Sequence, residues 1–240
     1  MRYLNLSFDD AAANLACDEA LLQHMEADPS ADACLRVWQT TKRFVVLGHS
    51  KRLFSDVNVS LCNANRVPIL RRISGGGTVL QGPGCLNYSL FLRSGARHLK
   101  TIGDTFDYVL RRHRLIVNEI CGTKKVCIQG TSDLAIDGRK FSGNAQYRKS
   151  GCLLVHGTFL LDFDLRLIEK FLAVPTQQPA YRKGRPHLQF LTNLNVEATQ
   201  LCGRLQQAWQ ANDEHFDVPI ARMEALVRDR YQRREWSEKF

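Results

Sequence analysis

Long apolar runs are missing from this sequence. Its apolar stretches, such as those at 44–47 and 152–155, are far shorter than the roughly 20 residues that a membrane-spanning helix needs. The first residues, Met1 to Asn5, likewise form no apolar stretch of signal-peptide length. The sequence therefore predicts a cytoplasmic protein that is not associated with a membrane.

Metal-binding and disulfide spacings are missing as well. None of the eight cysteines forms a Cys-x-x-Cys pair, and no histidine pair completes a zinc-like spacing. A disulfide framework is not expected in a chain of 240 residues that shows no export signal. We therefore expect most of the cysteines to be small buried apolar residues; they stand at 17, 34, 62, 85, 121, 127, 152 and 202.

Motifs of nucleic-acid-binding proteins are also missing. The formal net charge is +9, which favours an anionic partner through long-range attraction. Charge alone fits either a nucleic acid or a nucleotide together with an acidic carrier protein. The chain has no helix-turn-helix pattern and no RNA-binding aromatic signature, and its basic residues are scattered, with the densest cluster at 228–234. We therefore predict no nucleic-acid partner.

What the sequence does have is the composition of one good-sized globular domain, with 44% apolar and 24% charged residues. Helical spacing and cap residues predict helices over 8–25, 55–65, 104–120, 164–172, 197–211 and 219–233. Runs of β-branched and aromatic residues predict strands over 34–39, 43–47, 67–72, 78–81, 86–92, 125–129 and 152–163, and 175–195 is expected to be a loop. This order predicts an α+β fold with a mixed central sheet flanked by helices.

Three consecutive glycines follow the strand predicted at 67–72. They let a ligand approach the backbone closely, and the motif consists of Arg71, Arg72, Ser74, Gly75, Gly76 and Gly77. Exposed backbone N–H groups and guanidinium groups both bind anions such as phosphate and carboxylate. The motif is neither a P-loop, because no Gly-Lys-Ser/Thr follows, nor the dinucleotide fingerprint. By itself it fits an anion-binding turn or a plain turn between strands.

A lysine follows a predicted hairpin turn. The pair Asp137-Gly138 predicts the turn, and Lys140 comes directly after it. Small and polar residues at 142–146 leave room for a ligand beside the lysine and supply hydrogen-bonding groups. Read alone, Lys140 also fits a solvated surface lysine, Asp133 a turn carboxylate, and His156 a core histidine.

Taken together and in this order, these stretches resemble the lipoate–protein ligase A family of the biotin/lipoate protein ligase superfamily. Residues 71–77 match an Arg-Arg-x-Ser-Gly-Gly-Gly motif, and residues 138–145 match Gly-Arg-Lys-x-Ser-Gly-x-Ala. Residues 84–88 resemble the family's glycine-containing turn into a strand, and 156–161 its His-Gly-Thr-Leu-Leu strand. Segments at 14–19, 38, 181–185 and 190–194 are similar too, so the resemblance covers about residues 8–195.

The resemblance implies the mixed-sheet catalytic fold of these ligases and a set of site residues. Lys140 would be the central catalytic residue, contacting the acyl carbonyl and the α-phosphate, where negative charge develops. Asp133 would lie near the phosphates, where magnesium would sit, and His156 would lie beside the acyl chain. The implied binding residues are Arg71, Arg72, Ser74, Gly75, Gly76, Gly77, Asn87, Asp133, Ser142, Gly143, Asn144, Ala145, His156, Gly157 and Thr158.

The resemblance further implies an ATP-dependent lipoate–protein ligase that uses ATP and Mg²⁺. Such an enzyme activates lipoate or octanoate as acyl-AMP and transfers the acyl group to a lysine of an acceptor, either a lipoyl domain or a glycine-cleavage H-like protein. We expect a monomer with a catalytic domain at 1–195 and a short helical segment at 196–240. Because bacterial-type ligases often carry a larger accessory domain, either this segment is a reduced accessory unit that suffices, or a separate protein helps, or the chain does not adenylate.

The alternative activity is an ATP-independent octanoyl or lipoyl transferase that acts through a cysteine thioester. Its nucleophile needs exposure and a lowered thiol pKa. Cys127 lies near the region where one transferase group carries its cysteine, about two residues off register, and Cys85 stands where ligases often have asparagine. The other transferase group has its cysteine after the His-Gly strand, and here no cysteine lies between His156 and Cys202. The sequence favours the ligase; a biotin-type ligase, a catalytically silent relative or a nucleic-acid-binding protein on this scaffold are the remaining alternatives.

Overall fold

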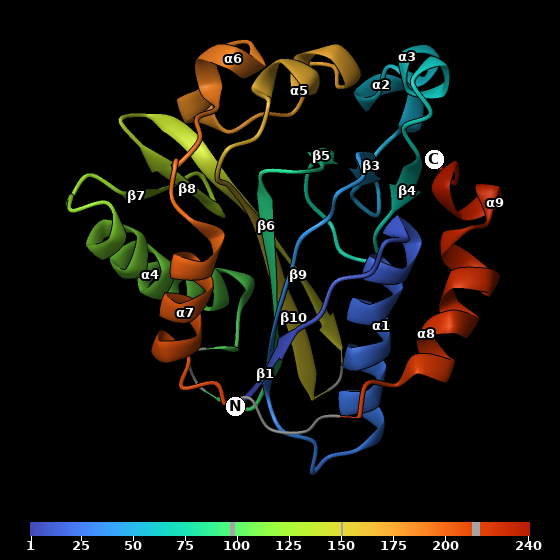
Figure 1. The fold of residues 1–240 in the computed structure, drawn as a ribbon, viewed down its shortest axis with the longest axis vertical. Helices are drawn as coiled ribbons and strands as arrows, with labels where there is room; N and C mark the ends of the chain where they lie inside the picture. The colour runs from blue at the N-terminus through green and yellow to red at the C-terminus, as the bar shows by residue number, and fades with distance from the viewer. Residues whose placement is uncertain (97–98, 150, 213–216) are drawn as a thin grey trace.

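The computed structural model describes residues 1–96, 99–149, 151–212 and 217–240, and its centre is a seven-stranded sheet (Figure 1). The pair β1 with β2, at one edge of this sheet, is parallel, and the other strand pairs of the sheet are antiparallel. The sheet is therefore mixed, as predicted. In spatial order its strands are β1 (Arg2–Asn5), β2 (Cys34–Trp38), β6 (Cys85–Arg93), β10 (Cys152–Leu160), β9 (Arg139–Lys149), β8 (Asp133–Ile136) and β7 (Cys127–Gln129).

A three-stranded sheet stands beside the large one. Its strands are β4 (Ile69–Arg71), β3 (Phe44–Leu47) and β5 (Val79–Gln81), with β3 parallel to β4 and antiparallel to β5. The helices α5 (Leu165–Phe171) and α6 (His187–Phe190) pack near this sheet through a separate apolar cluster. Because β4 leads into the three glycines and β5 leaves them, this small sheet fixes both ends of the glycine turn.

Both faces of the large sheet are covered by helices (Figure 1). On one face α4 (Ile102–Ile120) packs against α7 (Ala198–Ala208), while on the other α1 (Ala11–Ala27) packs against β6, β10 and α8 (Ile220–Leu226). In β10, Leu153 and Val155 belong to the apolar cluster around α4, and Leu154 belongs to the one around α1. This two-sided burial explains why the strand is a continuous apolar run without alternation.

Side-chain caps mark the starts of the two longest helices, which begin at Ala11 and Ile102, whereas the sequence predicted starts at 8 and 104. The Asp10 side chain accepts a hydrogen bond from the N–H of Ala12 at the start of α1. Thr101 and Asp104 form a reciprocal capping box at the start of α4. Each cap satisfies backbone N–H groups that have no partner inside the helix.

Three predicted elements differ in the structure. The helix predicted at 55–65 is split into α2 (Leu53–Asp56) and α3 (Val59–Ala64), because Val57 leaves the helix to pair with Leu172 and Asn58 caps the second piece. The stretch 175–195 contains a short 3-10 helix, η2 (Ala180–Arg182), as well as α6. The last predicted helix is α8 followed by a π-helical turn, η3 (Val227–Tyr231), and then by α9 (Arg234–Ser237). Within the described residues no helix is long and apolar enough to cross a membrane.

Candidate active site

A cavity of about 720 Å³ collects most of the predicted site residues. They come from the glycine turn, from β6, and from the three adjoining strands β8, β9 and β10. The predicted residues that line it are Arg72, Gly75, Gly76, Gly77, Asn87, Asp133, Lys140, Ser142, Gly143, Asn144, Ala145, His156, Gly157 and Thr158. Tertiary structure thus brings together segments that lie far apart in the sequence.

Strand register places four of these residues in one row across the sheet. Asp133 on β8 pairs with Gly143 on β9, Gly143 with Thr158 on β10, and Thr158 with Asn87 on β6. Directly paired residues point to the same face of a sheet. The row therefore forms a continuous floor under the cavity.

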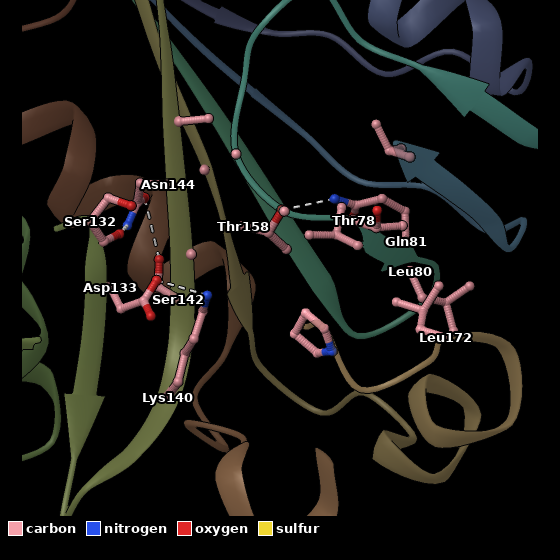
Figure 2. A pocket seen from close by; sticks show the side chains of 18 of the residues that line it. Thr78, Leu80, Gln81, Ser132, Asp133, Lys140, Ser142, Asn144, Thr158 and Leu172 are labelled. Carbon is pink, nitrogen blue, oxygen red and sulfur yellow. Dashed lines mark hydrogen bonds and ion pairs between the residues drawn. The ribbon is translucent and has the colours of Figure 1, made fainter. Parts of the chain in front are cut away.

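Lys140 reaches this floor beside Asp133 (Figure 2). Its ammonium lies 2.7 Å from Asp133 Oδ1. The turn before it is the predicted hairpin, with Asp137 at φ 49° and Gly138 at φ 72°, values typical of the type I′ turn that joins two strands tightly. A Cβ atom on Gly143 would lie 2.6 Å from Lys140 Nζ, so the glycine leaves the space that the ammonium fills.

Tyr181 holds the other side of Asp133. Its hydroxyl donates a hydrogen bond of 2.8 Å to Asp133 Oδ2. Burial and the neighbouring Asp133 carboxylate raise the pKa of the Tyr181 phenol, which therefore remains a proton donor. The segment 181–185 belongs to the family resemblance, but Tyr181 was not predicted as a site residue, because its contact joins η2 to a strand 48 residues earlier.

Arg72 lies under the glycine turn and holds its carbonyl groups. Nε and Nη2 donate to Ser74 Oγ (2.9 Å), Gly75 O (2.7 Å from Nη2) and Gly77 O (2.9 Å). Burial lowers the pKa of Arg72 to about 10, so the group stays charged at neutral pH. No carboxylate of the described chain forms an ion pair with it, and these bonds leave Nη1 free to bind an anion.

His156 is hydrogen-bonded to Ser74, which is buried and does not itself line the cavity. Ser74 Oγ lies within hydrogen-bond distance of His156 Nε2, at 2.6 Å, and also accepts a hydrogen bond from Arg72 Nε. Burial, reinforced by the Arg72 charge, lowers the pKa of His156 to about 3. Its other nitrogen lies 4.0 Å from Asp18 Oδ2. His156 is therefore a neutral wall residue at physiological pH, unsuited to transferring protons there.

Two amide side chains on the cavity wall each have an unpaired atom. Gln81 Nε2 donates to Thr158 Oγ1 (2.8 Å), and Thr158 Oγ1 donates to Asn87 Oδ1 (2.6 Å), as part of Figure 2 shows. Gln81 Oε1 and Asn87 Nδ2 are buried without a partner. Exchanging N and O in both amides still leaves one donor and one acceptor. Gln81 lines the cavity beside Thr158 but was not predicted to belong to the site.

Arg71 lies outside the cavity, contrary to the expectation that it binds substrate. Its side chain is fully buried. Successive residues of an extended segment point to opposite sides, so Arg71 and Arg72 diverge. All its hydrogen bonds go to backbone carbonyls, namely those of Gly48, His49, Lys51, Trp236 and Ser237.

Neither candidate nucleophile faces Lys140 across the cavity. Cys85 is fully buried, and burial raises the pKa of its thiol to about 12. Cys127 is partly exposed on β7, and the register Cys127–Ala135–Lys140 places it two strands away, about 10 Å between backbones. The eight cysteines all lie in the described chain, and none lines the cavity.

Asp133 does not form a complete magnesium site with other protein ligands in the part of the chain that the structure describes. Its two carboxylate oxygens are already engaged by Lys140 and Tyr181. Among the described residues, no group of three or more histidine, cysteine, aspartate or glutamate side chains could hold a metal ion. A magnesium ion that arrives with the phosphates of a nucleotide needs few protein ligands, and this role of Asp133 stays a prediction.

The fold and the cavity define the class of protein, and comparison with known sequences gives the family. Residues 10–210 match the family described as the lipoyl protein ligase A/B catalytic domain, so the chain belongs to that family. The predicted family is thereby confirmed. The matched segment contains the cavity-lining residues that the four motifs contributed.

Similar proteins carry two kinds of name. A probable lipoate-protein ligase A of Mycoplasma pneumoniae is 30% identical over 161 residues, which cover 67% of this chain and 45% of that protein. An octanoyltransferase, LipM of Oceanobacillus iheyensis, is 27% identical over 227 residues, covering 87% of this chain and 82% of that protein. The chain thus spans less than half the length of the ligase it matches and most of the length of the transferase.

Solved structures confirm the predicted fold class. A bipartite lipoate protein ligase of Thermoplasma acidophilum, described together with its E2 lipoyl domain, superposes with a TM-score of 0.83 at 20% identity. The superposition covers 99% of this chain and 95% of that one. A lipoate-protein ligase A bound with ATP gives a TM-score of 0.80 at 19% identity, covering 99% and 98%.

Proposed function

We propose that the chain is an ATP-dependent lipoate–protein ligase. The observation that carries the proposal is the cavity itself. It holds a fixed ammonium, that of Lys140, and a buried guanidinium, that of Arg72, whereas no thiol lines it. Cations suit a reaction in which negative charge develops on a phosphoryl group and then on a carbonyl oxygen.

The chemistry has two steps. In the first, a carboxylate oxygen of lipoate or octanoate attacks the α-phosphorus of ATP, the bond to pyrophosphate breaks, and acyl-AMP forms. In the second, the neutral amine of an acceptor lysine attacks the acyl carbonyl carbon, AMP leaves, and the nitrogen loses a proton. Lys140 stabilises the developing charge in both steps, while Asp133 and Tyr181 keep its ammonium in place.

The acyl chain would lie along the apolar part of the lining. Leu15, Trp38, Val46 and Val79 line the cavity where α1 and the small sheet approach the large one. An eight-carbon chain gains roughly 0.8 kcal/mol for each methylene group that it buries there.

The alternative is a transferase that carries the acyl group on Cys127. It is favoured by the similarity to an octanoyltransferase and by the row that Cys127 shares with Lys140. The two activities differ in their energy source. A ligase needs ATP and no thiol, whereas a transferase needs a thiolate that attacks the acyl donor and forms a thioester.

One experiment separates the two. The protein is incubated with a lipoyl-domain acceptor and free lipoate or octanoate, with and without ATP, and the acceptor is weighed by intact-mass spectrometry. We expect a mass shift only with ATP, and equal activity from Cys127→Ser, Cys85→Ser and the double variant. An acylated wild-type protein together with an inactive Cys127→Ser variant would establish the transferase instead.

The remaining predictions concern the setting of this activity. The acceptor would be a lipoyl domain or a glycine-cleavage H-like protein. The division at residue 195, the monomeric state and the cytoplasmic location stay predictions as well. Size-exclusion chromatography with light scattering of the full chain tests the monomer.

A further inference from the structure

A second loop forms one wall of the cavity together with the glycine turn. This 48–51 loop consists of Gly48, His49, Ser50 and Lys51. The N–H of His49 donates to Ser74 O at 2.8 Å, and a Cβ atom on Gly48 would lie only 2.2 Å from Gly76 O. The two loops are therefore packed backbone against backbone, and Ser50 and Lys51 line the cavity.

The backbone of Lys51 is fixed by two hydrogen bonds. Its N–H donates to Gly48 O at 3.0 Å, and its carbonyl accepts from Arg71 Nη1 at 2.7 Å. The residue is half-buried and lines the cavity. Within residues 1–96, 99–149, 151–212 and 217–240, the ammonium of Lys51 forms no ion pair, in contrast to that of Lys140, which Asp133 neutralises.

The charges of the lining favour a polyanion. The lining has four cationic residues, Lys51, Arg72, Lys140 and Arg182, against two carboxylates, Asp56 and Asp133. Both carboxylates are engaged, since Asp133 pairs with Lys140 and Asp56 accepts a hydrogen bond of 2.7 Å from Thr78. The cavity therefore has an excess of two positive charges, which a ligand with several negative charges would neutralise.

The C-terminal residues hold the 48–51 loop from behind. Arg71 donates to Trp236 O (3.1 Å) and Ser237 O (2.9 Å), and Trp236 Nε1 donates back to Arg71 O at 2.8 Å. The His49 ring contacts the rings of Trp236 and Phe240 edge-on, each at 5.9 Å between centroids. A single guanidinium thus joins the C-terminal residues to three carbonyls of the loop that carries Lys51.

We propose that Lys51 binds the phosphate groups of the activating nucleotide and that Trp236, acting through Arg71, positions it. The inference rests on the proposed ligase activity and deepens it. Lysine is a compact cation on a flexible stem and suits a terminal phosphate or a departing pyrophosphate. Arg72 adds a second positive charge below the glycine turn, but Ser74 and the carbonyl groups of the turn already accept from most of the Arg72 donors.

Calorimetry of the full chain with inorganic pyrophosphate and with ATP tests the binding role. The variant is Lys51→Ala, and Arg52→Ala is the matched control, because Arg52 is the next residue, is exposed, does not line the cavity and removes the same charge. For Lys51→Ala we expect the Kd of both ligands to rise roughly tenfold, the loss of one charge-assisted hydrogen bond. Arg52→Ala should change it less than about twofold, and lipoate affinity should stay unchanged in both.

A double-variant cycle tests the positioning role. Trp236→Phe removes the indole N–H that bonds to Arg71 O and reduces the ring that His49 contacts, but keeps an aromatic ring in place. We expect a smaller rise in the pyrophosphate Kd, of about threefold, and no further rise when Trp236→Phe is added to Lys51→Ala. If the losses of pyrophosphate binding in the two single variants add up in the double variant, Trp236 does not act through Lys51.

The outcomes separate this inference from the proposed function. If the wild type lipoylates its acceptor with ATP but Lys51→Ala binds pyrophosphate as tightly as wild type, the inference fails and the ligase stands. Equal losses in Lys51→Ala and Arg52→Ala, or no pyrophosphate binding by wild type, also refute it. If no ATP-dependent transfer occurs while Lys51→Ala alone loses pyrophosphate binding, the ligase activity fails and the phosphate site stands.

Discussion

Replacing Gly143 by alanine should inactivate the enzyme without removing any functional group. The added Cβ would lie 2.6 Å from Lys140 Nζ and 2.8 Å from Lys140 Cε. Non-bonded atoms of this kind rest at about 3.5–4.0 Å, so the ammonium must move by on the order of 1 Å. Lys140 is flexible at that end and will move, leaving its place beside Asp133 Oδ1.

The size of the effect follows from what is lost and what is kept. A misplacement of about 1 Å at a reacting centre costs roughly 10²-fold in rate. Stability should change by less than about 1 kcal/mol, because the partly exposed Lys140–Asp133 pair contributes little and Gly→Ala stiffens the unfolded chain. The variant should therefore melt like wild type and have a kcat about a hundredfold lower.

The assay is ATP-dependent lipoylation of an acceptor domain, followed by mass spectrometry, with thermal unfolding measured alongside. Gly203→Ala is the matched control, since no atom lies within 4 Å of its added Cβ on α7. Lys140→Ala should lose roughly 10²–10³-fold, and adding Gly143→Ala to it should cost nothing more. A Gly143→Ala variant that keeps more than a third of the wild-type kcat refutes the assignment of Lys140.

Three further predictions follow from the contacts. Tyr181→Phe keeps the ring but loses the 2.8 Å bond to Asp133, so kcat should fall about tenfold with an unchanged melting temperature, measured by steady-state kinetics and calorimetry. Gly84→Ala should lower the free energy of unfolding, measured in urea, by at least about 2 kcal/mol, because the φ of Gly84 is 89° and the added Cβ would lie 2.2 Å from a backbone oxygen. Gly122→Ala is the control, since Gly122 has φ 58° and open space around its added Cβ. Equal effects of the two substitutions would contradict the prediction. Burial, reinforced by a neighbouring arginine, lowers the pKa of His113 to about 3, below its usual value of 6.5. The stability that comes from keeping His113 neutral is therefore present above about pH 6.5 and is lost as the pH falls towards 3. His113→Gln should make the free energy of unfolding decline less steeply with falling pH. An unchanged decline in urea unfolding across this pH range would disprove the prediction.

Local patterns determined the elements of this protein. Asp137-Gly138 predicted the hairpin before Lys140, because positive φ at both positions is what a type I′ turn requires. The apolar run at 152–155 predicted a strand, and burial on both faces is the reason that it does not alternate. The order of these elements predicted a mixed sheet flanked by helices, and the ordered motifs predicted the family.

Boundaries were predicted less well where a distant contact ends an element. The helix predicted at 55–65 is broken because Val57 pairs with Leu172. Such a pairing joins segments more than a hundred residues apart in the sequence, and no local spacing encodes it.

Only the tertiary structure decided which side chains meet. Adjacent arginines of one motif diverge, Arg72 to the cavity and Arg71 to the C-terminal residues, because neighbouring positions of an extended chain face opposite ways. Cys127 and Lys140 are thirteen positions apart in the chain, yet two strand spacings separate them in the sheet. Tyr181 reaches Asp133, and Trp236 reaches His49 in the loop of Lys51, across 48 and more than 150 residues respectively. Sequence fixes such contacts only through the complete packing of the sheets and helices, since each depends on register and loop paths that no short motif contains.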